Sequence, residues 1–314
     1  IEGVENTPTD RELFLRWASI GAYTPMMRTH HGSRYGENWS FEGGPNPDKP
    51  EEPLSDPETL ATWKRLAAEH ISLFPYQQAY GQVAVDRGLP IMRHPLLVFP
   101  EDPVFAGELP DEAAWDAFDA VSLPDGETFQ YFLGDELLVA PIVDEGVDTR
   151  PVHLPAGGWV DIRSGERFEG PGTVMAEAEP GDIPVYAPDG AVIPRLPEGV
   201  ETLAPTDAPD VVDHTDVADQ LVIDVVSGAD GSFTLVDGTE LAVDSGRDRA
   251  LEGPVTATVD GDELDTSADG GFVTVLTPRT GDVEIVLSDD DGDETVVEVS
   301  GAPLERAYTV RLLG

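Results

Sequence analysis

Residues 55–99 have the sequence SDPETLATWKRLAAEHISLFPYQQAYGQVAVDRGLPIMRHPLLVF. Residues 55–58 have the serine-to-glutamate spacing of a capping box, and the apolar side chains that follow recur at helical spacing. Pro75 should break or kink this helix, and a second helical segment continues to Gly88, which suits the position just after a helix end. The apolar run at residues 89–99 then predicts a buried strand.

A helix and a short strand precede this region. Residues 9–12 form another capping box, and the helix that follows them should end before Pro25. Residues 25–28 have the character of a short strand, whereas residues 43–53, GGPNPDKPEEP, predict an exposed loop because their prolines suit neither a helix nor a central strand. A strand, a loop, paired helices and a strand in this order predict part of an α/β barrel.

The pattern changes after Pro124. Short apolar runs, separated by Gly, Pro and Asp, replace the helical period, and such runs are typical of a β-sandwich. A stretch rich in Pro and Asp at residues 196–210 divides the runs into two groups. We therefore expect an α/β plus β fold with three units: the C-terminal part of a (β/α)8 TIM barrel at residues 1–123, a proximal β-sandwich domain at residues 124–198 and a distal acidic β-sandwich domain at residues 199–314.

The chain is strongly acidic. Its 314 residues include 62 Asp and Glu against 18 Lys and Arg, for a formal net charge of -44, and its two lysines are Lys49 and Lys64. This charge would repel duplex nucleic acid and anionic membranes, so we expect neither as a partner. Because strand-like apolar runs persist in residues 201–314, the acidity does not indicate a disordered tail. We interpret it as a habitat signature, typical of proteins from organisms with molar internal salt.

Several absences narrow the functional classes. The sequence has no Cys, which excludes disulfides, thiolate metal sites and cysteine nucleophiles. No run of about 18 apolar residues is present, so we expect no membrane span. We predict no cofactor, because neither a phosphate-binding loop nor metal-ligand spacing occurs. The N-terminal residues lack both the features of a signal peptide and an initiator Met, so we expect a cytoplasmic protein of which this chain is a fragment.

Residues 23–41, YTPMMRTHHGSRYGENWSF, gather cationic, aromatic and hydrogen-bonding side chains in a segment with no long apolar run. In a chain that is otherwise acidic, this density suits a polyhydroxylated or anionic ligand. The alternative is a loop whose Arg and Trp side chains cover the end of a core. Composition by itself leaves both interpretations open.

Four motifs occur along the chain in the order that is typical of a known family. They are DRELFLRWASIGAYTPMMRTHHG, LPIMRHPLLVFPED, YFLGDELLVAPIV and VHLPAGGWVDIRSGERFEG. Together they resemble the C-terminal half of glycoside hydrolase family 31 over residues 8–195, and residues 220–245 resemble the distal β-domain of that family. The segment TPMMRTHHGSRYGENWSF is most similar to the sulfoquinovosidase branch, although His31 stands where that pattern has Glu.

The resemblance implies a retaining α-glycosidase that works through two Asp side chains, one as the nucleophile and one as the acid and base. Both family aspartates would precede Ile1, so we expect no catalytic residue in this chain and no activity from the chain alone. His30, in the Arg-x-His position, would hydrogen-bond sugar hydroxyls, and Arg28 would pair with acidic groups at the same strand end. Trp39 would help to wall the pocket.

The remaining polar candidates receive supporting roles. Arg34 and Asn38 are further candidates for the pocket wall, Arg93 would brace the barrel mouth, and Asp135 would make a structural hydrogen bond at a domain junction. The isolated histidines are expected to be structural: His70, His94, His153 and His214. The expected partner is a small-molecule glycoside, with the sugar open among glucose, xylose and sulfoquinovose and the oligomeric state open. The alternative is a non-catalytic carbohydrate-binding or structural β-domain protein.

Overall fold

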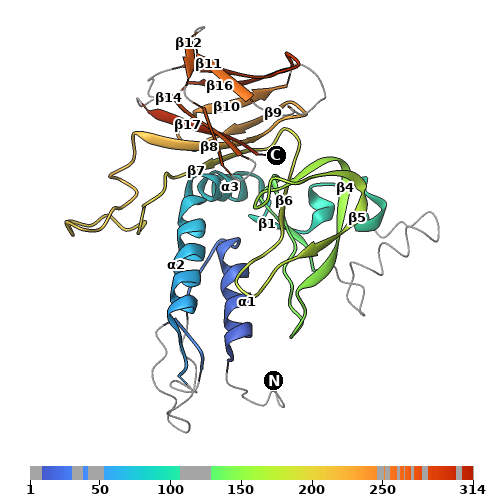
Figure 1. Ribbon diagram of the computed structural model, residues 1–314, viewed down its shortest axis with the longest axis vertical. Coiled ribbons are helices and arrows are strands. Elements are labelled where there is room, and N and C mark those ends of the chain that lie inside the picture. The colour runs from blue at the N-terminus through green and yellow to red at the C-terminus, as the bar shows by residue number, and fades with distance from the viewer. Residues whose placement is uncertain are drawn as a thin grey trace.

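The computed structural model describes residues 9–29, 38–41, 53–106, 129–245, 251, 255–259, 262–264, 266–269, 272–277, 282–301 and 306–313. In Figure 1 the helices α1 (Arg11–Ala22) and α2 (Pro57–Ser72) lie side by side, and α3 (Phe74–Arg87) lies at their upper end beneath the distal sheets. A 3-10 helix at Pro95–Leu97 and the short helix α4 at Pro103–Ala106 follow. Among the described elements, α1, α2 and α3 therefore precede every strand, and β1 is the only strand that precedes the 3-10 helix and α4.

Two aspartates, each one residue later than the predicted cap, begin α1 and α2. The Asp10 carboxylate accepts a hydrogen bond from Leu13 N at 2.8 Å, and the Asp56 carboxylate accepts one from Thr59 N at 2.6 Å. The shift at α2 has a clear cause, because Pro57 has no N–H group and a fixed φ that suits the first helical position. The helices thus lie where the capping spacing predicts them, with each cap moved by one residue.

The chain bends between α2 and α3, as the sequence predicts. The first of these helices ends at Ser72, and the second begins at Phe74 with Pro75 in its first turn. Gly88 ends α3 in the left-handed conformation, with a φ of 72°, and its N–H group donates to Ala84 O at 3.0 Å. Both the break at the proline and the glycine cap are therefore confirmed.

The predicted strands of the barrel portion are shorter than expected or absent. In the described part of the chain, residues 25–29 join no sheet, and within residues 89–99 the only strand is β1 (Met92–Arg93). Pro90 and Pro95 lie on either side of β1, and neither can donate a backbone hydrogen bond to a neighbouring strand. The prediction of a continuous buried strand over residues 89–99 is therefore wrong for most of its length.

The first sheet is antiparallel, with six strands in the order β1-β2-β3-β6-β4-β5. Its other strands are β2 (Tyr131–Leu133), β3 (Leu137–Val139), β4 (Thr149–Asp161), β5 (Arg167–Glu177) and β6 (Val185–Pro188). The long strands β4 and β5 pair as a hairpin beside α4 (Figure 1). Trp159, Phe132 and Leu138 are buried and pack together as the core of this sheet.

The distal unit contains two sheets (Figure 1). One has the order β12-β11-β15-β16-β10-β9, formed by β9 (Gly231–Thr234), β10 (Glu240–Asp244), β11 (Val255–Val259), β12 (Asp262–Leu264), β15 (Val283–Asp289) and β16 (Glu294–Ser300). The other has the order β13-β14-β17-β8-β7, formed by β7 (Val192–Arg195), β8 (Gln220–Val226), β13 (Thr266–Asp269), β14 (Phe272–Thr277) and β17 (Ala307–Leu313). Side chains in β15 and β16 alternate between buried and more exposed positions, as expected for strands with one face in a core.

The observed order of helices followed by three sheets agrees with the predicted fold class. The division at residues 1–123, 124–198 and 199–314 stays a prediction, and the strand pairing places β1 with the first sheet and β7 with a distal sheet. Among the helices that the structure describes, none combines the length and the apolar composition needed to cross a bilayer.

Candidate functional site

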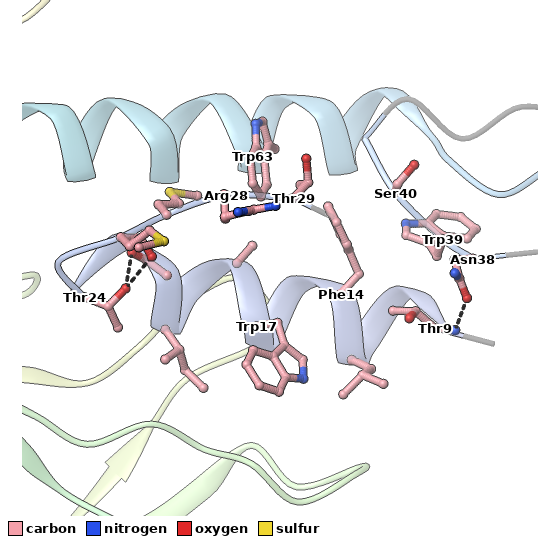
Figure 2. A pocket seen from close by; sticks show the side chains of 16 residues that line it. Thr9, Phe14, Trp17, Thr24, Arg28, Thr29, Asn38, Trp39, Ser40 and Trp63 are labelled. Carbon is pink, nitrogen blue, oxygen red and sulfur yellow. Dashed lines mark hydrogen bonds between the residues drawn. The ribbon is translucent and has the colours of Figure 1, made fainter. Parts of the chain in front are cut away.

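A cavity of about 440 Å³ lies along α1 and is also bounded by residues 24 and 26–29, by residues 38–40 and by Trp63 of α2. In Figure 2, Phe14, Arg28, Thr29 and Trp63 lie between the two helices, whereas Trp17 points away from α2. The cavity therefore lies at the two described ends of the segment 23–41 that the sequence analysis singles out. Arg28 is the one charged side chain among its described lining residues, and none of these is a carboxylate.

Stacked aromatic rings hold one wall of this cavity. The Trp63 ring, on α2, stacks with both Phe14 and Phe41, with ring centroids 5.7 Å and 4.7 Å away and interplanar angles of 27° and 16°. Such stacked contacts add to the burial of the rings, so they fix the spacing between the two helices. Trp17, on α1, is 67% exposed at the cavity (Figure 2).

Trp39 lines the cavity, and the N–H group of its indole ring already has a hydrogen-bond partner. Its indole Nε1 donates to the Thr59 hydroxyl at 3.2 Å, and its backbone N donates to Thr9 O at 2.7 Å. The neighbouring Asn38 accepts from Thr9 N through its Oδ1 atom at 2.9 Å, which leaves the Asn38 amide NH2 group without a partner among the described residues. Trp39 can therefore present an apolar face to a ligand, while Asn38 can donate hydrogen bonds.

Arg28 is exposed and faces the same cavity as Trp39 (Figure 2). It makes no hydrogen bond or ion pair with any residue that the structure describes. The ion pair predicted for Arg28 thus has no counterpart in the described part of the chain. A guanidinium whose donors have no partner among the described residues, in a cavity with no described carboxylate, favours a ligand that carries hydroxyl or anionic oxygens.

The structure brings together two of the three predicted binding residues, Arg28 and Trp39, at one cavity. His30 lies outside the described residues, as do His31 and Arg34. The contact of His30 with sugar hydroxyls therefore stays a prediction.

Arg93 and Asp135 form a structural pair away from this cavity. The Arg93 guanidinium makes an ion pair with the Asp135 carboxylate, and its Nε donates to Pro90 O at 2.9 Å. Its Cζ atom also lies 4.9 Å from the centroid of the Tyr80 ring. Asp135 thus makes the structural contact expected of it, and Arg93 ties β1 to the turn between β2 and β3.

Sequence reasoning missed a buried carboxyl next to that pair. Glu136 lies within hydrogen-bond distance of two hydroxyls of α3, those of Tyr76 at 2.8 Å and Tyr80 at 2.6 Å. Burial raises the pKa of Glu136 to about 7, against the opposing effect of these two hydroxyls. The spacing of the two tyrosines, i and i+4 on one helix, is the signal that could have indicated a shared partner.

A second buried contact involves His153, which the sequence analysis regards as structural. Its Nε2 atom lies 3.0 Å from the Asp102 carboxylate, and its backbone N donates to the Gln130 side chain at 3.0 Å. Hydrogen bonding and the charge of His153 hold the pKa of Asp102 below its usual value, although burial raises it. Phe105 packs edge-on against the imidazole at 5.1 Å between ring centroids. These contacts join α4 to β4 and support a structural role.

Two family models match the chain. The model of the glycosyl hydrolases family 31 TIM-barrel domain matches residues 3–78, and that of the glycosyl hydrolase family 31 C-terminal domain matches residues 88–193. Between them they cover the helices α1 and α2, the candidate cavity and all six strands of the first sheet. The match confirms the family resemblance and the predicted sequence of a barrel portion followed by β-domains.

The chain is also similar in sequence to curated glycosidases. The chain is 35% identical over 176 residues to a sulfoquinovosidase of Escherichia coli strain K12, a match that covers 56% of this chain and 21% of that protein. It is 30% identical over 188 residues to a 1,3-alpha-isomaltosidase of Kribbella flavida, covering 59% of this chain and 23% of the relative. The chain therefore spans between a fifth and a quarter of these two relatives.

Solved structures share the fold over nearly the whole chain. A cycloalternan-forming enzyme from Listeria monocytogenes superposes with a TM-score of 0.62 at 21% identity, covering 97% of this chain and 28% of that enzyme. A GH31 dextranase from Flavobacterium johnsoniae, solved with glucose, superposes with a TM-score of 0.57 at 20% identity, covering 93% and 37%. At these identities the likeness shows the fold, including the distal β-domain that the family models do not reach.

Proposed function

The chain belongs to glycosyl hydrolase family 31, and we propose that the protein to which it contributes is a retaining α-glycosidase that hydrolyses terminal α-glycosides. The cavity along α1 then forms one wall of the sugar site. The observation that supports this assignment is its lining, which offers aromatic faces, amide and hydroxyl groups and the guanidinium of Arg28, but no described carboxylate. Since the reaction needs two carboxyl groups, both are supplied by residues outside this wall.

Each wall residue has a separate role in this proposal. Trp39 contributes an apolar face against the C–H groups of a sugar ring, because its N–H is bound to Thr59. Arg28 donates hydrogen bonds to ligand oxygens, and His30, two residues further on, completes the Arg-x-His position of the family and bonds sugar hydroxyls. All three act on binding and orientation, and none of them reacts.

Among the possible sugars we favour a sulfoquinovoside. The supporting observations are the similarity to the Escherichia coli sulfoquinovosidase and the cation of Arg28, which has no ion-pair partner among the described residues and suits an anionic substituent better than a hydroxymethyl group. Glucose and xylose glycosides are the competing substrates.

The test uses the complete protein and three nitrophenyl α-glycosides, those of sulfoquinovose, glucose and xylose. We expect the highest kcat/KM for the sulfoquinovoside and no turnover of any of them by the 314-residue chain alone. Turnover by the isolated chain would overturn the placement of the catalytic carboxyls. Glycan binding by the complete protein without turnover would favour the non-catalytic binding function instead.

A further inference from the structure

A second cavity, of about 250 Å³, lies where α2 meets both β-units. Four arginines from four different elements line it, which is a large share of the cations in a chain with 18 Lys and Arg. They are Arg65 on α2, Arg163 in the turn between β4 and β5, Arg195 on β7 and Arg311 on β17. An adjoining cavity of about 330 Å³ shares three of these arginines.

Three carboxylates line the cavity with the arginines, so its formal charge is one positive unit in a chain of net charge -44. Distant acidic groups are screened beyond a Debye length of about 8 Å at physiological ionic strength. The charge that a small ion meets in this cavity is therefore set by these seven side chains.

Asp224 is held by two of the arginines. Arg195 Nε donates to its Oδ2 atom at 2.6 Å, and Arg311 binds both of its oxygens through Nε and Nη2, at 2.5 and 2.6 Å. With 1% of its surface exposed, Asp224 faces no other ligand. These bonds join the neighbouring strands β7, β8 and β17 and fix both guanidinium planes.

The other two carboxylates are also paired. Glu69 accepts from the Tyr23 hydroxyl and from Arg195 Nη1, both at 2.8 Å, and the Arg195 charge holds the pKa of Glu69 below its usual value even though burial raises it. Asp182 accepts from Arg65 at 2.9 Å and forms an ion pair with Arg163 at 3.2 Å. Glu69 and Asp182 therefore already have arginines of the cavity as partners.

The arginines of this cavity have more N–H donors than they have acceptors among the described residues. Each arginine has five N–H groups, and no residue in the described part of the chain pairs with Arg195 Nη2, Arg311 Nη1 or the Nε and Nη1 atoms of Arg65. Planar guanidinium forks bind oxyanions with two parallel hydrogen bonds. Backbone and side-chain bonds already hold these forks in place, so a ligand would not have to order them.

We propose that this cavity binds a small inorganic oxyanion of the sulfate or phosphate type, coordinated by Arg65, Arg163, Arg195 and Arg311. The ion joins α2 to the first sheet and to the distal sheet, so binding stabilises the arrangement of the three parts. This site is independent of the sugar cavity and of the glycosidase proposal, since its test requires no turnover.

The test is isothermal titration calorimetry of the chain with potassium sulfate, with the ionic strength held constant by KCl. Calorimetry is preferred to a melting curve because sulfate also stabilises proteins by exclusion from their surface. We expect saturable binding to one site, weakened at least about tenfold by either Arg65→Gln or Arg163→Gln. These two side chains are 57% and 42% exposed and pair with Asp182, so their removal leaves the buried Asp224 bonds intact.

Two further variants sharpen the test. Arg87→Gln removes the same charge from the exposed end of α3 and should bind sulfate like the original chain. Asp182→Asn removes a negative charge from the cavity and should tighten sulfate binding by about threefold or more, which loss of a purely structural ion pair would not do. Heat changes without saturation, or equal affinities for Arg163→Gln and Arg87→Gln, would overturn the proposal.

Discussion

The Tyr76 hydroxyl lies 2.8 Å from the Glu136 carboxyl, and the same hydroxyl lies 2.6 Å from Leu133 O. A carbonyl oxygen can only accept, so the Tyr76 proton points to Leu133, and the Tyr80 proton points to Glu136 at 2.6 Å. When Glu136 is neutral, its own proton can serve the contact with Tyr76. This arrangement agrees with the pKa of Glu136, which burial raises to about 7.

The first prediction concerns pH. Because the pKa of Glu136 is higher in the folded chain, at about 7, than its usual 4.5, the folded state binds this proton more tightly. This proton stabilises the folded state by at most about 3 kcal/mol. The full contribution is present below the unfolded pKa and is lost as the pH rises through about 7.

Glu136→Gln keeps a neutral side chain that can both donate and accept, so it should remove this part of the pH dependence. Urea unfolding at about pH 5 and about pH 8 measures the difference between the two chains. We expect the variant to gain stability relative to the original chain as the pH rises. A constant difference at both pH values would show that Glu136 is ionised throughout.

A second prediction concerns Gly134, in the turn that carries Asp135 and Glu136. Its φ is +66°, and a Cβ atom added there would lie 2.2 Å from the Tyr76 hydroxyl oxygen and 2.3 Å from the Tyr80 ring. Gly134→Ala should therefore cost more than about 3 kcal/mol, because buried tyrosines must move. Gly146→Ala is the matched control, with a similar φ of +70° and no atom near the new Cβ, and should cost about 1 kcal/mol. Equal losses in chemical denaturation would refute the steric explanation.

The helices and caps show how far local sequence determines this fold. Capping spacing, the proline at position 75 and Gly88 predict α1, α2, α3 and their limits, because these signals act within one or two turns of helix. The run at residues 89–99 fails as a strand because its pairing depends on β2, some forty residues later in the chain, and on flanking prolines. Local hydrophobicity indicates burial but does not determine the partner.

The candidate site is also predicted only in part from the sequence. Composition singles out the segment 23–41, and the cavity does contain Arg28 and Trp39 from it. The aromatic stack around Trp63 depends on the packing of α1 against α2, which no local pattern encodes. The four arginines of the second cavity are up to 246 positions apart in sequence, and Arg311 reaches the cavity through the parallel pairing of β17 with β8, so spacing could not reveal them.

A third prediction concerns Asp224. Asp224→Ala should destabilise the chain by about 3 to 5 kcal/mol, because it leaves the guanidinium groups of Arg195 and Arg311 without their shared partner. The control is Asp86→Ala, on the exposed face of α3, where the loss should stay below about 1 kcal/mol. Urea unfolding followed by tryptophan fluorescence measures both. A loss at Asp224 no greater than that at Asp86 would mean that the buried ion pairs contribute nothing to stability.

A fourth prediction concerns salt. With a net charge of -44, the compact chain repels itself, and added KCl screens that repulsion. The melting temperature should therefore rise steeply as KCl increases from about 0.1 M to about 2 M, without saturating in the millimolar range. Potassium acetate at the same ionic strength should have a similar effect, since screening does not depend on the identity of the anion. A melting temperature that does not change with the KCl concentration would contradict the interpretation of the acidic composition as an adaptation to high salt.

The last prediction separates the two functions of Trp39 in the proposed sugar wall. Its indole N–H is bound to Thr59, so Trp39→Phe removes that anchor but keeps an aromatic face in the cavity. Thr59→Val removes the same hydrogen bond from the other side without touching the cavity lining. In the complete protein, both variants should retain kcat/KM within about tenfold, each with a loss of about 1 kcal/mol in stability.

Trp39→Ala removes the face itself and should lower kcat/KM on the preferred nitrophenyl glycoside by about a hundredfold, mainly through a higher KM. Arg28→Gln should cost a comparable factor on an anionic glycoside and less on a neutral one, because the lost contact is with charge. Steady-state kinetics of the four variants on charged and neutral glycosides provides the comparison. If Trp39→Ala and Thr59→Val lose activity equally, Trp39 acts by holding the start of α2 in place, and the sugar must be recognised elsewhere.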